Sequence, residues 1–342
     1  MPTRENGISP PRRVRQVANL AEVLTNHIPQ ALTNAAAKFV DSLKLSSVSE
    51  RVRRGRRVVI KHRNAYSEQL ADLANVYFRM SDIPIRFWSK VKDWKRWEIG
   101  CFRMLNGDRF RAFSSGANTI CVDKVPGKSL WVHLNRGTIT RQMLEAAAHE
   151  LRRAHQFWSD EFRGPWSHGD AGMENVVLNK KTGRARLIDF EIFHDRSLPA
   201  ATRHADDLLV FLLDLAAIAS REKWLTFALR FLDAYGNLDV IVELKNQLAL
   251  PSGMAWIWWG VRTSFANPAK VKQRLAKLRD LTAHLRYYRA VAAKRARKSR
   301  RASISCHEMS PGMPRASSRT RAIRESAKAA SPGIPRRLPT TT

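Results

Sequence analysis

The chain has few cysteines, and their positions follow no known pattern. Only Cys101, Cys121 and Cys306 occur among the 342 residues, and no two of them form a C-x-x-C pair. The sequence therefore offers neither a paired-thiol motif nor the ligand set of a structural zinc site. An odd number of unpaired cysteines is typical of a reducing compartment, and it excludes the small disulfide-stabilised proteins.

Long hydrophobic runs are also missing, although hydrophobic residues make up 44% of the chain, which is ample for a buried core. The longest run follows Leu208, and Asp214 interrupts it before it reaches the roughly 20 residues that a membrane helix needs. The first residues contain no hydrophobic region of the signal-peptide type. We therefore expect a cytoplasmic protein.

Acidic side chains are scarce, since 30 Asp and Glu stand against 60 Lys and Arg, a formal net charge of +30. The stretch after Lys294 is rich in Arg, Lys, Ser, Pro and Ala without hydrophobic periodicity, which predicts disorder. Basic segments of this kind attract an anionic membrane surface or nucleic acid. We favour the inner face of the cytoplasmic membrane over nucleic acid, and a tail without a specific partner is an equal alternative to the membrane.

A dense group of polar residues stands out against this background. It begins with His168-Gly169-Asp170, continues with Asn175, and ends with Ile188-Asp189-Phe190. Short apolar runs beside both ends predict two strands, with a turn at Gly183 between them. A carboxylate that orients a hydroxyl and two oxygen ligands for a metal are what a phosphoryl-transfer site needs. The alternative is an ordinary polar hairpin with incidental acids.

This segment resembles the catalytic and metal-binding loops of the protein-kinase-like superfamily. It is most similar to the branch that phosphorylates small molecules and glycolipids, such as aminoglycoside and choline phosphotransferases and lipopolysaccharide core or Kdo kinases. The resemblance implies that Asp170 meets the acceptor hydroxyl, that Asn175 binds Mg²⁺, and that Asp189 bridges Mg²⁺ and the phosphates of ATP. It covers about residues 55–290 and is most specific between residues 150 and 215.

Two departures from protein kinases indicate the class of acceptor. Position 169 is Gly rather than the Arg that pairs with a phosphorylated activation loop, and Glu191 replaces the Gly of the metal-binding triplet. Little chain separates Glu191 from the next helical pattern, which we expect to start at Asp206. There is little room for a peptide-docking loop, so both departures favour a small-molecule or glycolipid hydroxyl.

The nucleotide-binding residues are less clearly marked, because the chain has no G-x-G-x-x-G motif and offers only Gly55 for a nucleotide-covering turn. Lys61 follows a strand-like run and would reach the phosphates, with Glu98 as its ion-pair partner on a helix. Lys61 also lies within the basic run 51–63, so a solvated lysine is the alternative. The other lysines that could take the phosphate role are Lys90, Lys92 and Lys95.

The stretch from Thr119 to Leu130 reads as a strand, a Pro-Gly turn and a helix start. It resembles the hinge between two kinase lobes, which implies that the backbone at Asp123 and Val125 meets the adenine. A simple hairpin is an equally good interpretation.

Other polar and aromatic residues have structural interpretations. A helix is predicted from Thr140 to Phe157, and we expect His155 and His168 to brace the loop rather than transfer protons. Either Asp206 or Asp207 should hold the catalytic loop through backbone contacts, with the other one a charge in the first helical turn. A cluster of tryptophans is expected in the core, with a ligand groove as the alternative: Trp256, Trp258 and Trp259.

The resemblance predicts an α+β, two-lobed protein-kinase-like fold with a small antiparallel sheet in the N-lobe and a mostly helical C-lobe. The expected divisions are a basic extension (1–50), an N-lobe (51–126), a catalytic C-lobe (127–292) and a disordered basic tail (293–342). The expected function is ATP- and Mg²⁺-dependent phosphorylation of a hydroxyl of a sugar, a lipopolysaccharide core or another small molecule. The alternatives are a pseudokinase, an atypical protein kinase, and a basic nucleic-acid-binding protein.

Overall fold

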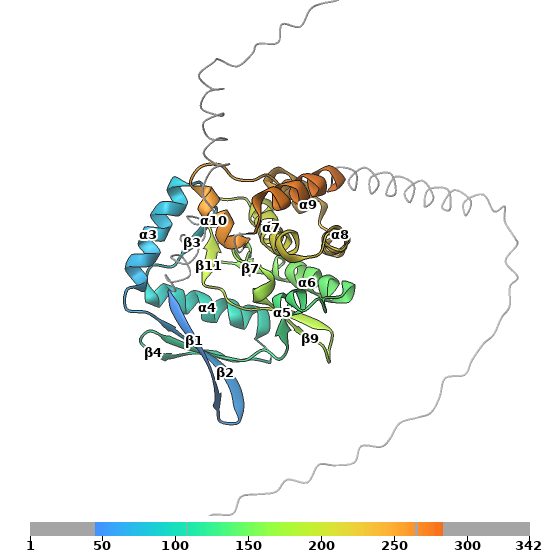
Figure 1. The fold of residues 1–342 in the computed structure, drawn as a ribbon. Coiled ribbons are helices and arrows are strands. Elements are labelled where there is room, and N and C mark those ends of the chain that lie inside the picture. Colours follow the sequence, from blue (N-terminus) through green and yellow to red (C-terminus); the bar gives the residue numbers. More distant parts are fainter. Residues whose placement is uncertain (1–44, 108, 264–265, 283–342) are drawn as a thin grey trace, which may run out of the picture. The chain divides into compact units, whose positions relative to one another are not determined.

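Figure 1 shows the computed structural model of the chain, which describes residues 45–107, 109–263 and 266–282. Small antiparallel sheets dominate the first part of the described chain, and helices dominate the part after residue 195. The expected α+β class is thereby confirmed. The predicted disorder of the basic tail and Cys306 lie outside the described residues.

A four-stranded antiparallel sheet contains the strand that carries Lys61. Its order is β1-β2-β5-β4, and its strands are β1 (Ser46–Arg53), β2 (Arg56–Arg63), β4 (Ala112–Gly116) and β5 (Thr119–Asp123). Arg54 and Gly55 have φ angles of 50° and 73°, which suits the two-residue turn between β1 and β2. Lys61 pairs with Ile120 across β2 and β5, and β1 begins ahead of the boundary expected at residue 51.

Helix α4 (Val91–Asn106) lies against this sheet and buries one continuous face. The face repeats every three or four residues, as an amphipathic helix requires. It consists of Trp94, Trp97, Glu98, Cys101, Phe102, Leu105 and Asn106. Helix α3 (Ser67–Met80) and the short β3 (Ile85–Phe87) precede α4, and β3 pairs with β11 (Ile192–His194) from the middle of the chain.

Short elements connect the sheet to the helical part. They are β6 (Lys128–Ser129), α5 (Leu130–Asn135), α6 (Arg141–Ala154), β7 (Trp158–Ser159) and β8 (Gly164–Pro165). The side chain of Thr140 accepts a hydrogen bond from the backbone N–H of Met143 at 3.4 Å, so the predicted N-cap of α6 is confirmed. The helix ends at Ala154, three residues before the expected end at Phe157.

The polar segment forms the predicted pair of strands. A 3₁₀ turn (Met173–Asn175) leads into β9 (Val176–Asn179), which pairs with β10 (Arg184–Leu187) and β6. Gly183 has a φ of 67° in the connecting turn, as its position predicted. Gly127 is required for a different reason, because a Cβ there would lie 2.2 Å from the carbonyl oxygen of Leu178.

The helical part is built around α7 (Ala200–Ile218), which is buried along most of its length. It is followed by α8 (Trp224–Tyr235), α9 (Leu238–Gln247), α10 (Ala255–Arg262) and a helix at 268–282. The expectation that this helix starts at Asp206 was wrong, because α7 begins at Ala200 and Asp206 lies in its interior.

The tryptophans of α10 belong to the packing. Trp256 and Trp259 are buried and stack with ring centroids 4.8 Å apart, and Trp258 meets Phe78 edge-on at 5.0 Å. The expected placement in the core is confirmed for Trp256 and Trp259, and the partly buried Trp258 lies at the margin of a second hydrophobic cluster. Among the residues that the structure describes, no helix is long and apolar enough to cross a membrane.

The stacked pair Phe211 and Phe231 provides a test of the helical core. Both rings are almost fully buried, with centroids 4.0 Å apart and planes 8° from parallel. We expect Phe211→Ala to lower the free energy of unfolding by about 3–5 kcal/mol, because it removes a ring and leaves a cavity. Urea unfolding checks this, with the exposed Val76→Ala as a control that should change stability little. An equal effect of the two substitutions would contradict the packing described.

Candidate active site

Lys61 lies between two carboxylates in the interior of the protein. Its Nζ is 2.5 Å from Oε1 of Glu98 and 2.8 Å from Oδ1 of Asp189. Only 7% of Lys61 is exposed, so it is not a solvated lysine of the basic run. The structure thus brings the predicted pair of Lys61 and Glu98 together, and it adds Asp189 from 128 residues away.

The competing lysines do not reach this cluster in the part of the chain that the structure describes. Lys90 pairs with Glu68 at the surface, and Lys95 donates to the backbone carbonyls of Gly116 and Ala117. Lys92 lies on α4 and is exposed to solvent. Lys61 therefore has the position expected of the phosphate-binding lysine.

Glu98 also fixes the loop that carries Asp189. Its second oxygen accepts the backbone N–H of Phe190 at 3.0 Å, so a single carboxylate from α4 holds both Lys61 and this loop. Asp189 has a φ of 65°, a left-handed conformation that Asp tolerates better than most residues. Its side chain remains 39% exposed and opens towards solvent.

The charges of this cluster shift the pKa of each member. Burial lowers the pKa of Lys61, but Asp189 and Glu98 outweigh that effect and hold it above its ordinary value. Burial raises the pKa of Glu98 to about 7, against the pull of Lys61. Burial would also raise the pKa of Asp189, but the ammonium of Lys61 outweighs it and lowers the pKa. The ammonium of Lys61 is thus the charge that keeps Asp189 ionised.

Glu191, which replaces a glycine of the kinase triplet, has its own partners. Its Oε1 lies 3.3 Å from Nη1 of Arg63 and accepts a hydrogen bond from the Ser46 hydroxyl at 2.6 Å. Arg63 is 1% exposed and places its guanidinium 4.8 Å from the ring centroid of Trp94. No local sequence pattern marks Arg63 as the partner of Glu191, because 128 residues separate the two.

The loop of residues 168–175 is held by side chains of α7. The carboxylate of Asp207 accepts the backbone N–H groups of His168 and Gly169, both at 2.8 Å, which confirms that one of the two aspartates anchors the loop. Asp214, which also lies on α7, accepts a hydrogen bond from the backbone N–H of Met173 at 2.7 Å. Gly169 has a φ of 88°, and a Cβ there would lie only 3.1 Å from the Cα of Phe193.

Asp206 is not a first-turn charge, as was expected of one of the two aspartates. Its two carboxylate oxygens accept hydrogen bonds from the two terminal nitrogens of Arg262, both at 2.8 Å. One of these oxygens also lies 3.1 Å from Nε2 of His194. The same guanidinium donates to the carbonyl of Gly169 at 3.2 Å, across 93 residues of sequence. Arg262 is therefore a residue of this site that sequence reasoning missed, since no local pattern marks a contact over such a distance.

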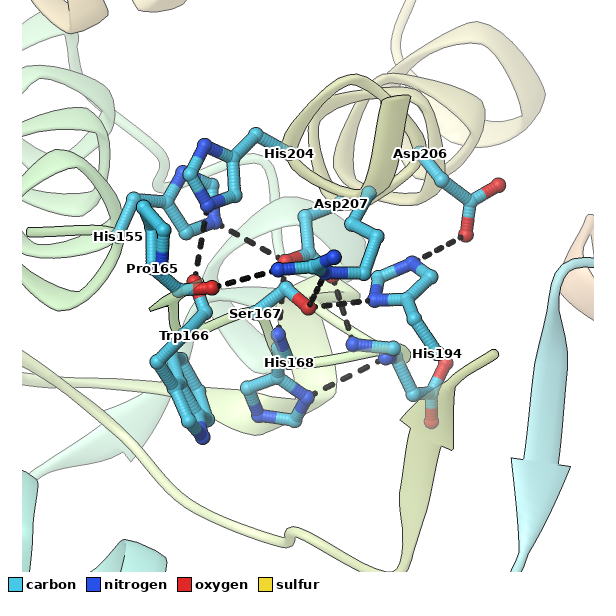
Figure 2. A network of polar contacts seen from close by, with 12 residues as sticks. His155, Pro165, Trp166, Ser167, His168, His194, His204, Asp206 and Asp207 are labelled. Atoms are coloured by element: carbon cyan, nitrogen blue, oxygen red, sulfur yellow. Dashed lines mark hydrogen bonds and ion pairs between the residues drawn. The ribbon is translucent and has the colours of Figure 1, made fainter. Parts of the chain in front are cut away.

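Figure 2 shows the histidines of this network between α7 and the loop. His155 contacts Asp207 at 3.0 Å and the Tyr235 hydroxyl at 2.8 Å, and its ring stacks on His204 at 3.8 Å. His168 bonds to the carbonyl of Ile188 at 3.0 Å. Burial lowers the pKa of both His155 and His168, so both rings are neutral at physiological pH. These contacts fit the bracing role expected of the two histidines.

Asp170 and Asn175 are in direct contact. The Asn175 amide donates to the backbone carbonyl of Asp170 at 2.9 Å and to its Oδ2 at 3.1 Å. Burial raises the pKa of Asp170 to about 7, and the charge of Arg262 opposes that rise. Among the described residues, no group of three His, Cys, Asp or Glu side chains could hold a metal without other ligands.

The expected adenine contacts, Asp123 and Val125, lie where β5 leaves the sheet. The carboxylate of Asp123 accepts from the Arg111 backbone at 3.0 Å and lies 3.3 Å from the Arg56 guanidinium. Val125 is 7% exposed and packs in the core. In the described part of the chain, no hydrogen bond or ion pair joins either residue to Lys61, Glu98 or Asp189, so their role in adenine binding stays a prediction.

The charge of Arg262 provides a test of the loop geometry. We expect Arg262→Met to raise the pKa of Asp170 above its wild-type value, because the guanidinium favours the ionised carboxylate. Carboxyl NMR titration without divalent cations measures this shift. Arg262→Lys should raise the pKa less, and the exposed Arg79→Met should not change it. An unchanged Asp170 pKa in Arg262→Met would contradict the proximity of the two groups.

Comparisons with known proteins add little to this geometry. No protein-family model matches the chain, and no curated protein matches it. One matching solved structure is the complex of Rv3197 with erythromycin from Mycobacterium tuberculosis, at 15% identity and a TM-score of 0.30. The match covers 54% of this chain and 51% of that one, so this chain spans about half the length of its structural neighbour. A similarity of this size shows neither a shared fold nor a shared ligand.

Proposed function

We propose that the protein is an ATP- and Mg²⁺-dependent phosphotransferase with a hydroxyl acceptor. The observation that carries the proposal is the position of Lys61, which contacts both Glu98 and Asp189. A lysine on a sheet strand, paired with a helix glutamate beside a metal-binding aspartate, is the arrangement that aligns nucleotide phosphates in protein-kinase-like enzymes. Asp170 and Asn175 supply the second half of such a site.

The arrangement of elements supports a two-lobed protein-kinase-like fold. The β1-β2-β5-β4 sheet and α4 would form the smaller lobe, and α6 to α9 the larger one (Figure 1). The connection between them is residues 124–127, directly after β5. The loop around Asp170 and the Asp189 loop both belong to the second part, and the Asp189 loop contacts Lys61 and Glu98 of the first.

The residues present fit a magnesium ion together with ATP. The donors would be the amide oxygen of Asn175 and the carboxylate of Asp189, and Mg²⁺ in nucleotide sites takes one or two carboxylates plus phosphates and water. The neighbouring charges agree, because Glu98, Asp189 and Glu191 outnumber Lys61 and Arg63. When bound, the ion would neutralise charge on the phosphates.

Lys61 and Asp170 would position the two reacting groups, the phosphates and the acceptor hydroxyl. The Lys61 ammonium would bind phosphate oxygens, and Glu98 would keep it in place. The Asp170 carboxylate would orient the acceptor hydroxyl and receive its proton, while Asn175 holds one carboxylate oxygen still. Catalysis would then rest mainly on positioning and charge neutralisation.

The chain after Asp189 favours a small acceptor. Ile192 to His194 pair with β3 immediately after the metal loop, and α7 begins at Ala200. Between them only a short segment remains, which leaves little chain for docking a peptide. We therefore propose a sugar hydroxyl, such as one of a lipopolysaccharide core, or a hydroxyl of another small molecule, rather than a protein side chain.

An anionic membrane surface is the proposed partner of the basic segments. The β1–β2 hairpin contributes to them within the described chain, with Arg51, Arg53, Arg54, Arg56 and Arg57 all exposed. Such a surface would hold the enzyme near a lipid-linked acceptor at the inner face of the membrane.

A pseudokinase is the second candidate, and one observation favours it. The turn between β1 and β2 consists of only Arg54 and Gly55, which is too short to cover a triphosphate as a glycine-rich loop does. A basic nucleic-acid-binding protein and an atypical protein kinase remain further alternatives, without a contact that favours either.

Nucleotide binding tests the metal assignment first. We expect Asp189→Asn to abolish magnesium-dependent ATP binding, because it removes the charged oxygen ligand while keeping the side-chain size. Calorimetry with and without Mg²⁺ measures this, and Asp239→Asn, an exposed residue of α9, is the control. Unchanged binding in Asp189→Asn would remove Asp189 from the metal site. No binding in the folded wild type would favour the pseudokinase.

Turnover tests the role of Asp170. We expect Asp170→Asn to keep ATP binding and to lower phosphoryl transfer by about 10²–10⁴-fold, because the amide cannot accept the proton. The assay follows transfer to a panel of acceptors that includes lipopolysaccharide and aminoglycosides. Wild-type turnover in this variant would show that Asp170 does not act on the acceptor.

A further inference from the structure

A cleft of about 910 Å³ lies away from the proposed phosphoryl-transfer site. Its walls are the C-terminal end of α4, one face of α6, and the turn and strand that follow Gly183. None of Lys61, Glu98, Asp170, Asn175 and Asp189 lines it. The volume falls within the range of about 300–1,000 Å³ that is usual for small-molecule sites.

The lining of the cleft is strongly basic. Among the lining residues that the structure describes, five arginines stand against two glutamates, Glu145 and Glu150, an excess of three positive charges. The arginines come from three separate parts of the chain: Arg103, Arg109, Arg153, Arg184 and Arg186. Three of them, Arg103, Arg109 and Arg184, are exposed, so their charge is open to a ligand.

Two of these arginines are held in fixed positions. Arg186 donates to the Asn106 side chain at 3.0 Å and lies 5.1 Å from the ring centroid of Phe110. Arg153 donates to both carboxylate oxygens of Glu150 at 2.7 Å and to the carbonyl of Leu105 at 3.0 Å. Guanidinium groups fixed in this way lose little further entropy when they bind an anion.

Like charges lie close to Arg186 in this cleft. Burial lowers the pKa of Arg186, and the charges of Arg153, Arg109 and Arg184 lower it further, while Glu150 opposes them. Because arginine stays charged in proteins, the repulsion persists at every physiological pH. An anion between these side chains would relieve it.

We propose that this cleft binds a small molecule that carries a pyrophosphate or two phosphate groups. Such a group has a charge close to the excess of three, and arginine forks bind phosphate oxygens in a bidentate geometry. The site is separate from the proposed nucleotide site and does not depend on the proposed function.

Inorganic pyrophosphate is the probe for this site. Calorimetry on the full chain, without magnesium, measures its binding. Salt at about 150 mM reduces nonspecific attraction to the basic segments. We expect saturable binding by the wild type, and binding weaker by about tenfold or more in the double variant Arg184→Gln/Arg186→Gln, because charge-assisted hydrogen bonds are lost. The control is Arg79→Gln/Arg221→Gln, which removes the same charge from exposed positions outside the cleft.

Two single variants separate the site from general charge and from misfolding. Arg186→Lys keeps the charge but loses the planar fork, so it should weaken binding. Arg184→Gln changes an exposed residue and should weaken binding without affecting the fold, which circular dichroism checks.

Several results would overturn the proposal. The first is that the wild type shows no saturable pyrophosphate binding. The second is that the cleft variant and its charge-matched control weaken binding equally. The third is that the cleft variant binds pyrophosphate as tightly as the wild type does. Duplex DNA that binds through the cleft arginines while pyrophosphate does not would also overturn it, because the ligand would then be a nucleic acid.

Discussion

Three aspartates of α7 hold the loop of residues 168–175, and the rest of the candidate site depends on them. Asp207 binds two successive backbone N–H groups of the loop, and Asp214 binds a third, that of Met173. Asp206 reaches the loop indirectly, through an arginine that also binds the carbonyl of Gly169. Burying these acids is costly, and hydrogen bonds offset that cost at Asp206 and Asp207, because both oxygens of each carboxylate have a partner. Burial instead raises the pKa of Asp214 to about 8. The position of Asp170 is thus set by a helix that lies in the core.

The parts of the site that are close in sequence could be predicted, and the parts joined only by folding could not. Asp170 and Asn175 share one loop, and Glu98 follows a clear helical stripe, so their spacing was informative. Arg63 and Arg262 gave no comparable sign, because each meets its partner across a long separation and stands in no periodic pattern. The start of α7 was misplaced for a related reason.

The expected helix left out the polar residues just before Asp206, including Arg203 and His204, yet both are buried. Arg203 donates to the carbonyl of Pro165 at 2.7 Å, and His204 donates to that of Trp166 at 2.9 Å. Their partners belong to a strand and loop that the helix meets only in the folded protein. The polar residues at the start of α7 therefore do not indicate exposure, because backbone carbonyls accept their hydrogen bonds in the folded protein.

The segment after Asp189 has a consequence for molecules that would block this site. Glu98 holds the N–H of Phe190, Glu191 is held by both Arg63 and Ser46, and the next residues pair with β3. An inhibitor that requires this segment to swing out, with Phe190 leaving its buried place, would have to break all of these contacts first. The free energy of that opening would be subtracted from its affinity. Compounds shaped to fit the segment where it now lies would avoid this loss and would bind more tightly.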